Sequence, residues 1–261
     1  MSIEVKGLTF AYGQRMVLNG ADLTANAGEL LAVLGANGSG KSTLFNCILR
    51  LLPPKSGGVF IDGVPTSDMS TAELARHIAY VPQSHNPSFS YSVFDMVLMG
   101  TTPKIRGMGV PGRREEDQAN AALEMLDIAE LHSRAYTEIS GGERQLTLIA
   151  RAIAQQAPVL IMDEPTANLD YGNSLRVLSK IKELAREGYT IIQSTHNPDH
   201  AFLFADSVAA LSDGRMAAFG TPAETITPEL VELLYDVRVT VEQASNGAYT
   251  CIPAMPNTAQ A

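Results

Sequence analysis

A glycine-rich run in the first fifth of the chain has residue types suited to holding phosphates. It fits the pattern G-x4-G-K-[ST] and lies between an apolar strand-like segment and a helix-like one. Glycines let backbone N–H groups wrap around phosphates, a lysine can reach the β- and γ-phosphates, and a serine hydroxyl can bind Mg²⁺. In another context the run could be a flexible turn. Here we predict that a nucleotide binds at Gly35, Ala36, Asn37, Gly38, Ser39, Gly40, Lys41, Ser42 and Thr43.

Two adjacent carboxylates could complete this chemistry. Asp163 and Glu164 follow directly on the apolar run 159–162. An apolar strand that ends in acids places them at the sheet edge where the glycine-rich loop also opens. We expect Asp163 to hold Mg²⁺ and Glu164 to orient or deprotonate the attacking water. An isolated pair of acids would more simply be a solvated loop, so this interpretation depends on the loop upstream.

A second possible anion site occurs later in the chain. Ser140, Gly141 and Gly142 precede a helix predicted from Glu143 to about 155. The N-terminus of a helix favours negative charge. One nucleotide cannot easily use two such sites from the same chain, but two copies arranged head to tail can enclose two nucleotides. The sequence therefore predicts an isologous homodimer.

The surrounding pattern predicts a mixed α/β core. Apolar runs over 29–34, 159–162 and 190–193 are typical of buried parallel strands. The alternation from Ile3 to Phe10 indicates an earlier strand region. Helices are expected over 41–52, stopped by two prolines, and over 175–187. Residues 92–154 should be mostly helical, apart from a loop over 101–112.

Composition restricts the other possibilities. The formal net charge of −9 argues against a broad electrostatic grip on nucleic acid. Two cysteines, Cys47 and Cys251, favour a reduced compartment over a disulfide-rich scaffold. The first ten residues do not resemble a secretory leader, and no run approaches the roughly 18 apolar residues that span a bilayer. If the protein acts at a membrane, we expect another chain to cross it.

Residues 139–145 have the sequence Ile-Ser-Gly-Gly-Glu-Arg-Gln. This run, which contains Ser140, Gly141 and Gly142, resembles the signature of ATP-binding cassette (ABC) ATPases. The resemblance implies that Tyr12 stacks on adenine, that Gln83 senses Mg²⁺ and water, and that His196 contacts the γ-phosphate. Taken alone, each could be an ordinary turn or loop residue. The resemblance also implies nucleotide contacts from the opposite subunit by Ser140, Gly141, Gly142, Glu143 and Asp170.

This resemblance covers nearly the whole chain and implies its fold and chemistry. The implied fold is a P-loop NTPase with a RecA-like α/β core, an antiparallel β subdomain near the N-terminus and an inserted helical subdomain over about 84–157. We expect the ATPase domain to occupy 1–220 and a short extension to occupy 221–261. The implied catalytic residues are Lys41, Gln83, Glu164 and His196, and the implied Mg²⁺ residues are Ser42, Gln83 and Asp163.

The particular type of cassette follows from what surrounds the motifs. Segment 43–139 has no sustained heptads, and the chain has one cassette, so a transporter ATPase is favoured over a repair or translation protein. Residues 92–100, 227–230 and 234–237, together with a polar hairpin that ends near 253, resemble importers of iron-siderophores, haem and cobalamin (type II importers). That resemblance implies two membrane permeases, an external binding protein and a place on the cytoplasmic face of the inner membrane.

Other interpretations stay open at this level. The cargo could be molybdate or another metal complex, and a soluble ATPase acting on nucleic acid or a protein machine is a less favoured alternative. Four further histidines, His77, His85, His132 and His200, are expected to be structural or solvated. The methionines, including Met96, Met99 and Met125, are expected to fill the core rather than bind metal.

Overall fold

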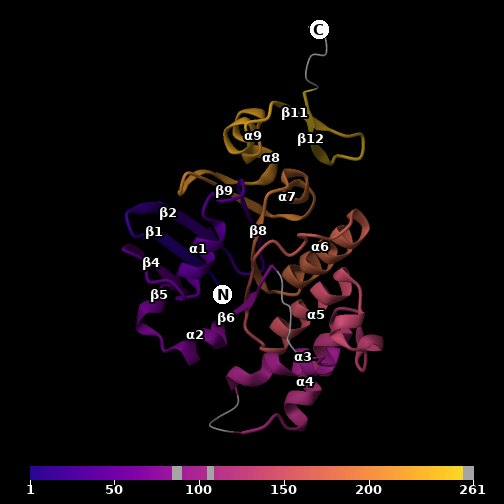
Figure 1. The fold of residues 1–261 in the computed structure, drawn as a ribbon. Coiled ribbons are helices and arrows are strands. Elements are labelled where there is room, and N and C mark those ends of the chain that lie inside the picture. Colours follow the sequence, from indigo (N-terminus) through magenta and orange to yellow (C-terminus); the bar gives the residue numbers. More distant parts are fainter. Residues whose placement is uncertain (84–89, 105–108, 255–261) are drawn as a thin grey trace.

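The centre of the fold is a six-stranded sheet with the order β10-β9-β3-β8-β7-β6 (Figure 1). The computed structural model describes residues 1–83, 90–104 and 109–254. All neighbouring strands are parallel except β10, which pairs antiparallel with β9. The strands are β3 (Leu30–Leu34), β6 (Ile78–Val81), β7 (Val159–Met162), β8 (Thr190–Thr195), β9 (Ser207–Ser212) and β10 (Arg215–Gly220).

Burial explains the apolar runs of the sequence. Every residue of β3, β7 and β8 is buried, because elements cover both faces of the central sheet. The expected α/β core is confirmed. The strand expected over 190–193 continues to Thr195, so its last two residues are polar and buried.

A second, antiparallel sheet packs on one side of the core, as expected for the N-terminal region. Its order is β2-β1-β4-β5. Four apolar side chains of its first strand, Ile3, Val5, Leu8 and Phe10, are buried, and a register shift lies between Val5 and Leu8. The strands are β1 (Ile3–Tyr12), β2 (Arg15–Ala25), β4 (Ser56–Ile61) and β5 (Val64–Pro65), and they are followed by η1 (Thr66–Asp68) and α2 (Thr71–His77).

Helix α1 (Lys41–Ile48) packs between the two sheets and is shorter than expected. The sequence predicted a helix over 41–52, stopped by prolines. Instead Leu49 is its C-cap, and Arg50 adopts a left-handed conformation with φ 57°. A left-handed residue cannot continue a right-handed helix, so this local conformation ends the helix before the prolines.

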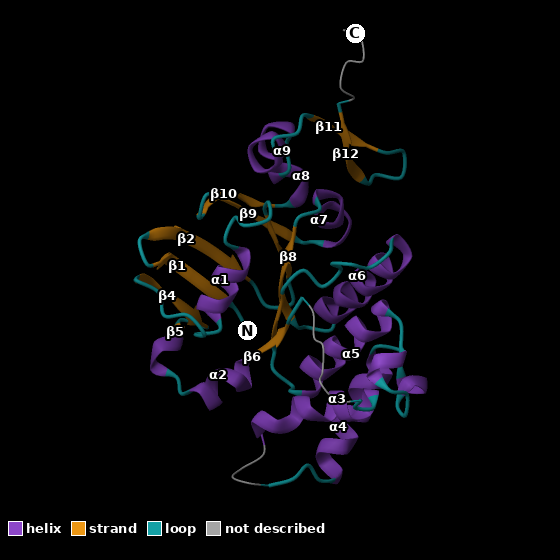
Figure 2. Cartoon of the chain, in the orientation of Figure 1, coloured by secondary structure: helices purple, strands orange, loops and turns teal. Residues whose placement is uncertain are grey.

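Most of the remaining helices gather on the other side of the central sheet (Figure 2). They are α3 (Val93–Leu98), η2 (Met99–Lys104), α4 (Arg113–Met125), η3 (Ala129–Leu131), η4 (Tyr136–Glu138), α5 (Gly141–Ala154) and α6 (Tyr171–Arg186). Three expectations need correction. The loop predicted over 101–112 begins as the 3₁₀ helix η2, although 105–108 lie outside the described residues. Helices α5 and α6 begin earlier than 143 and 175, because Ser140 and Asp170 cap them.

The methionine expectation was only partly correct. Met96 is fully buried in the helical core, but Met99 is 39% exposed and Met125 is 37% exposed. Both exposed residues lie near helix ends, where a side chain can face solvent without opening the core. Of the four histidines set aside, His132 stacks on Phe94, and His85 lies outside the described residues.

The C-terminal region packs against strands β3 and β9 of the central sheet. Residues of α7 and α9 form a third core with β3 and β9. The predicted polar hairpin is confirmed as two paired strands. The elements are α7 (Pro198–Phe204), α8 (Pro222–Thr225), α9 (Pro228–Tyr235), β11 (Val239–Gln243) and β12 (Tyr249–Pro253). In the described part of the chain, no helix has the length and apolar character needed to cross a bilayer.

Candidate active site

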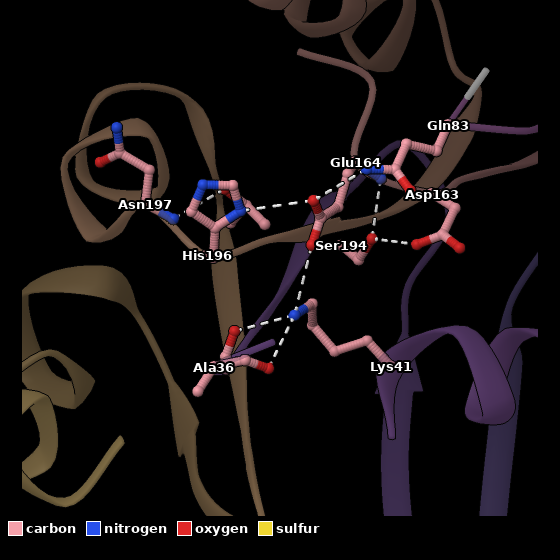
Figure 3. Close-up of polar contacts among 10 residues, drawn as sticks. Ala36, Lys41, Gln83, Asp163, Glu164, Ser194, His196 and Asn197 are labelled. Carbon is pink, nitrogen blue, oxygen red and sulfur yellow. Dashed lines mark hydrogen bonds and ion pairs between the residues drawn. The ribbon is translucent and has the colours of Figure 1, made fainter. Parts of the chain in front are cut away.

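Four loops bring the candidate residues to one edge of the central sheet. Strands β3, β8, β7 and β6 are consecutive and parallel, so their carboxyl ends share an edge. Gly35 follows β3, His196 follows β8, Glu164 lies just after β7, and Gln83 lies just after β6. Figure 3 shows side chains from these loops pointing toward one another.

Lys41 occupies the centre of the glycine-rich loop. It is the first residue of α1, and only 5% of it is exposed. Its Nζ donates to the carbonyl oxygens of Gly35 at 2.8 Å and Ala36 at 3.1 Å (Figure 3). The N-cap residue Gly40 has φ 110°, a conformation that favours glycine and lets the loop turn into the helix. The ammonium group therefore lies inside the loop, where phosphate oxygens could accept its protons.

A cavity of about 670 Å³ opens over this loop. Tyr12, at the turn between β1 and β2, is 52% exposed, and its ring meets Phe10 edge-on at a centroid distance of 4.9 Å. Most of the predicted nucleotide residues line the cavity, but Gly35, Ala36 and Ser39 do not. The lining residues are Tyr12, Arg15, Val17, Asn37, Gly38, Gly40, Lys41, Ser42, Thr43, Gln83 and Glu164.

Glu164 is the point at which the four loops meet. Its Oε1 lies 3.4 Å from Nζ of Lys41, and its Oε2 lies 3.4 Å from Nδ1 of His196. Gln83 Nε2 also donates to Oε2, at 3.4 Å. The carboxylate is 13% exposed and the backbone has φ 45°, which is unusual for a residue other than glycine. The carboxylate is thus held by polar groups from three other loops at the mouth of the cavity.

Ser194 joins the two acids and was missed from the sequence. Its hydroxyl donates to Oδ1 of Asp163 at 2.6 Å and accepts from the backbone N–H of Glu164 at 2.8 Å. The N–H of Asp163 is bonded to the carbonyl of Val81, which ties the acids to β6. The one sequence signal that could have identified Ser194 is its position as a polar residue near the end of the apolar run that forms β8. Burial raises the pKa of the neighbouring Tyr80 to about 12, and the charge of Asp163 adds to the rise.

His196 faces a second, smaller hollow of about 360 Å³. Its side chain lies beside Glu164 but is 52% exposed, so a ligand could still contact it. His200, expected to be structural or solvated, lines the same hollow. Burial lowers the pKa of His200, which favours its neutral form at pH 7.

The signature residues lie at the start of α5, away from the cavity over the loop. Ser140 caps α5 by accepting from the N–H of Glu143, whose Oε2 accepts from the N–H of Ser140 at 2.7 Å. Hydrogen bonds to the Glu143 carboxylate from the hydroxyl and then the backbone N–H of Ser140 lower the pKa of Glu143. Gly142 faces α6, where a Cβ atom would lie 2.6 Å from Oδ1 of Asn173.

Asp170 likewise serves as a cap within this chain. Its Oδ1 accepts from the N–H of Asn173 at 2.8 Å at the start of α6, and this bond lowers the pKa of Asp170. Neither Asp170 nor any residue of the signature lines the 670 Å³ cavity. Within one chain, the structure does not bring the predicted opposite-subunit residues to the phosphate loop.

The sequence profile of the ABC transporter family matches residues 18–167. The hemin import ATP-binding protein HmuV of Streptomyces coelicolor is 40% identical over 95% of this chain and 88% of its own length. The cobalamin import ATP-binding protein BtuD of Halobacterium salinarum is 35% identical over 100% of this chain and 66% of its own length. The chain therefore belongs to the ABC transporter family.

Comparison of structures agrees with this assignment. A solved transporter assigned to the metal-chelate type of ABC transporter, in an inward-facing conformation, has a chain that superposes with a TM-score of 0.87. The two chains are 32% identical, and the match covers 97% of each. Dimeric ATP-binding cassettes are also among the similar solved structures. The protein is an ATP-binding, ATP-hydrolysing subunit of an ABC transporter complex.

Proposed function

We propose that this subunit powers the import of haem, cobalamin or a related metal chelate. The observation that carries the ATPase part of the proposal is the position of Glu164, held among Lys41, Gln83 and His196 beside a cavity of about 670 Å³. The similarity to hemin and cobalamin import proteins and to a transporter of metal-chelate type supports the class of cargo. The cargo itself would be recognised by other chains of the complex.

In the proposed mechanism, ATP enters with its adenine on Tyr12 and its phosphates in the loop. Lys41 exchanges the carbonyls of Gly35 and Ala36 for phosphate oxygens, since these are stronger acceptors for an ammonium group. Glu164 then accepts a hydrogen bond from the attacking water and orients it toward the γ-phosphate. His196 reaches the same phosphate from the next loop.

The donor set at this edge fits Mg²⁺. Ser42, Gln83 and Asp163 offer hydroxyl, amide and carboxylate oxygens, the hard ligands that Mg²⁺ prefers. Oδ1 of Asp163 is taken by Ser194, and among the described residues no hydrogen bond engages Oδ2. When bound, Mg²⁺ neutralises charge on the transferring phosphoryl group.

A homodimer would give the signature its role. The start of α5 is a helix N-terminus with Gly141 exposed, yet it does not line the cavity of its own chain. A helix N-terminus can bind an anion, but the cavity of its own subunit does not reach this one. A second copy placed head to tail would bring its bound nucleotide to the start of α5. We therefore propose that Ser140, Gly141, Gly142, Glu143 and Asp170 approach the ATP bound to the partner subunit.

The proposed complex contains two ATPase subunits at the cytoplasmic face and two permeases. We propose that residues 93–98 of α3 and the neighbourhood of Gln83 face the permeases, as the resemblance to type II importers implies. ATP-driven closure of the dimer would then move the permeases, and hydrolysis would reset them. An external binding protein would deliver the cargo to the opposite face.

The test is purification of the tagged chain from detergent-solubilised native membranes, followed by mass spectrometry of the chains that accompany it. A stoichiometric many-helix permease is the expected result. ATPase activity of that complex should rise when haem or cobalamin is supplied with the external binding protein, and molybdate serves as the comparison cargo. Recovery only with nucleic acid or repair proteins would overturn the transport role and leave the ATPase assignment intact.

A further inference from the structure

The C-terminal hairpin is attached to α7, the helix that follows the loop of His196 (Figure 1). Oδ1 of Asp199 accepts from the backbone N–H of Cys251 at 2.8 Å and from the hydroxyl of Thr250 at 3.2 Å. One turn further along α7, the ring of Phe202 stacks on Tyr249 with centroids 5.5 Å apart and planes 21° from parallel. Three consecutive residues of β12 therefore hold one face of α7.

Hydrogen bonds fix the backbone between His196 and the first turn of α7. The N–H of Asn197 donates to the hydroxyl of Thr195 at 3.1 Å. Oδ1 of Asn197 accepts from the N–H of Asp199 at 2.9 Å and from that of His200 at 3.3 Å. His196 lies between these two anchored neighbours (Figure 3). A shift of the first turn of α7 would therefore move His196 relative to Glu164.

The segment that leads into the hairpin approaches the same site from another side. Tyr235, the last residue of α9, packs against the core that contains Leu34, the residue before the phosphate loop. Its hydroxyl is buried, near the backbone N–H of Gly35. Burial raises the pKa of Tyr235, as do the nearby Cys251 and Glu164, while the N–H of Gly35 opposes the rise. The C-terminal segment thus reaches both the phosphate loop and the loop of His196.

We propose that Asp199 is a positioning residue for ATP hydrolysis, which binds β12 and thereby holds the start of α7, and with it His196, in place beside Glu164. The proposal rests on the role proposed above for His196. A two-stranded hairpin is marginally stable by itself, so its place on the molecule depends on contacts such as this one. Displacing a catalytic group by about 1 Å can cost on the order of 100-fold in rate.

The chain has no tryptophan, which makes a specific reporter possible. In a Tyr249→Trp background, the new indole replaces the ring that stacks on Phe202 and is the single tryptophan of the protein. Asp199→Ala should shift its emission to the red and lower kcat for ATP about ten- to a hundred-fold, with KM for ATP changed less than about threefold. Asp199→Asn keeps an acceptor oxygen and should restore most of both signals. Glu242→Ala, on the exposed face of the same hairpin, is the matched control.

Each other outcome has a defined meaning. If Asp199→Ala releases the hairpin but kcat is unchanged, or if kcat falls with no change in emission, the positioning role is overturned. An Asp199→Ala protein that keeps both signals overturns it as well. A His196→Ala variant measured in parallel separates the two proposals, because full activity in that variant would refute the role of His196 itself. Phe202→Trp, from the opposite ring of the stack, provides an independent reporter should Tyr249→Trp fold poorly.

Discussion

Replacing Ser194 by alanine should damage the site more than the loss of one hydroxyl suggests. Ser194 is fully buried, donates to the Asp163 carboxylate at 2.6 Å, and accepts from the N–H of Glu164 at 2.8 Å. A hydrogen bond to a charged group contributes about 1.5–3 kcal/mol and a neutral one about 1 kcal/mol. We therefore expect Ser194→Ala to lower the free energy of unfolding by about 2–4 kcal/mol.

The same change should slow hydrolysis. Glu164 has a left-handed backbone conformation that costs of order 1–3 kcal/mol, and the bond from its N–H to Ser194 helps to hold it. Without that bond the carboxylate should move from its place, and we expect kcat to fall by about 100-fold. KM for ATP should change little, because Ser194 does not line the cavity over the phosphate loop.

Urea unfolding and steady-state ATPase assays measure the two effects. The matched control is Ser207→Ala, since Ser207 is also a buried strand serine but its hydroxyl has no hydrogen-bond partner among the described residues. The control should differ from the wild-type protein by less than about 0.5 kcal/mol or be slightly more stable. Equal unfolding free energies and equal kcat values for the two variants would refute this account of Ser194.

Three further substitutions test the remaining parts of the site. Glu164→Gln should lower kcat by about 10²- to 10⁴-fold and keep Mg-ATP affinity in a fluorescent-nucleotide assay, whereas Glu130→Gln, on the exposed surface, should match the wild type. Lys41→Ala should abolish measurable nucleotide binding in calorimetry, because the buried ammonium group is removed from the loop; retained affinity would contradict its assignment. Gly142→Ala should lower the thermal midpoint, since its Cβ would lie 2.6 Å from Asn173 Oδ1, and Asn173→Ala in the same chain should restore part of the loss.

Much of the local structure could be predicted because it depends on neighbours in the sequence. The strand before Gly35 and the strand before Asp163 are apolar runs that the central sheet buries on both faces. The hairpin near Asn246 has turn residues between two polar strands. The end of α1 could not be placed, since it depends on the left-handed conformation of Arg50, which its local sequence does not signal.

The residues of the site could be named, but their contacts could not. No spacing in the sequence shows that Glu164 lies 3.4 Å from Lys41, or that His196 reaches the same carboxylate. Those distances follow from the strand order β3-β8-β7-β6, which is set by packing between segments far apart in the chain. Ser194 was missed for the same reason, because its partners come from a different strand.

The sequence by itself predicted the chemistry of this protein from three short runs of adjacent residues: a phosphate loop, an acid pair and a signature. The tertiary structure decided how these groups meet. It placed four loops at one sheet edge, left the start of α5 outside the cavity of its own chain, and connected Asp199 to β12. The reason is physical, since contacts between distant segments depend on strand order and core packing, which no local pattern specifies.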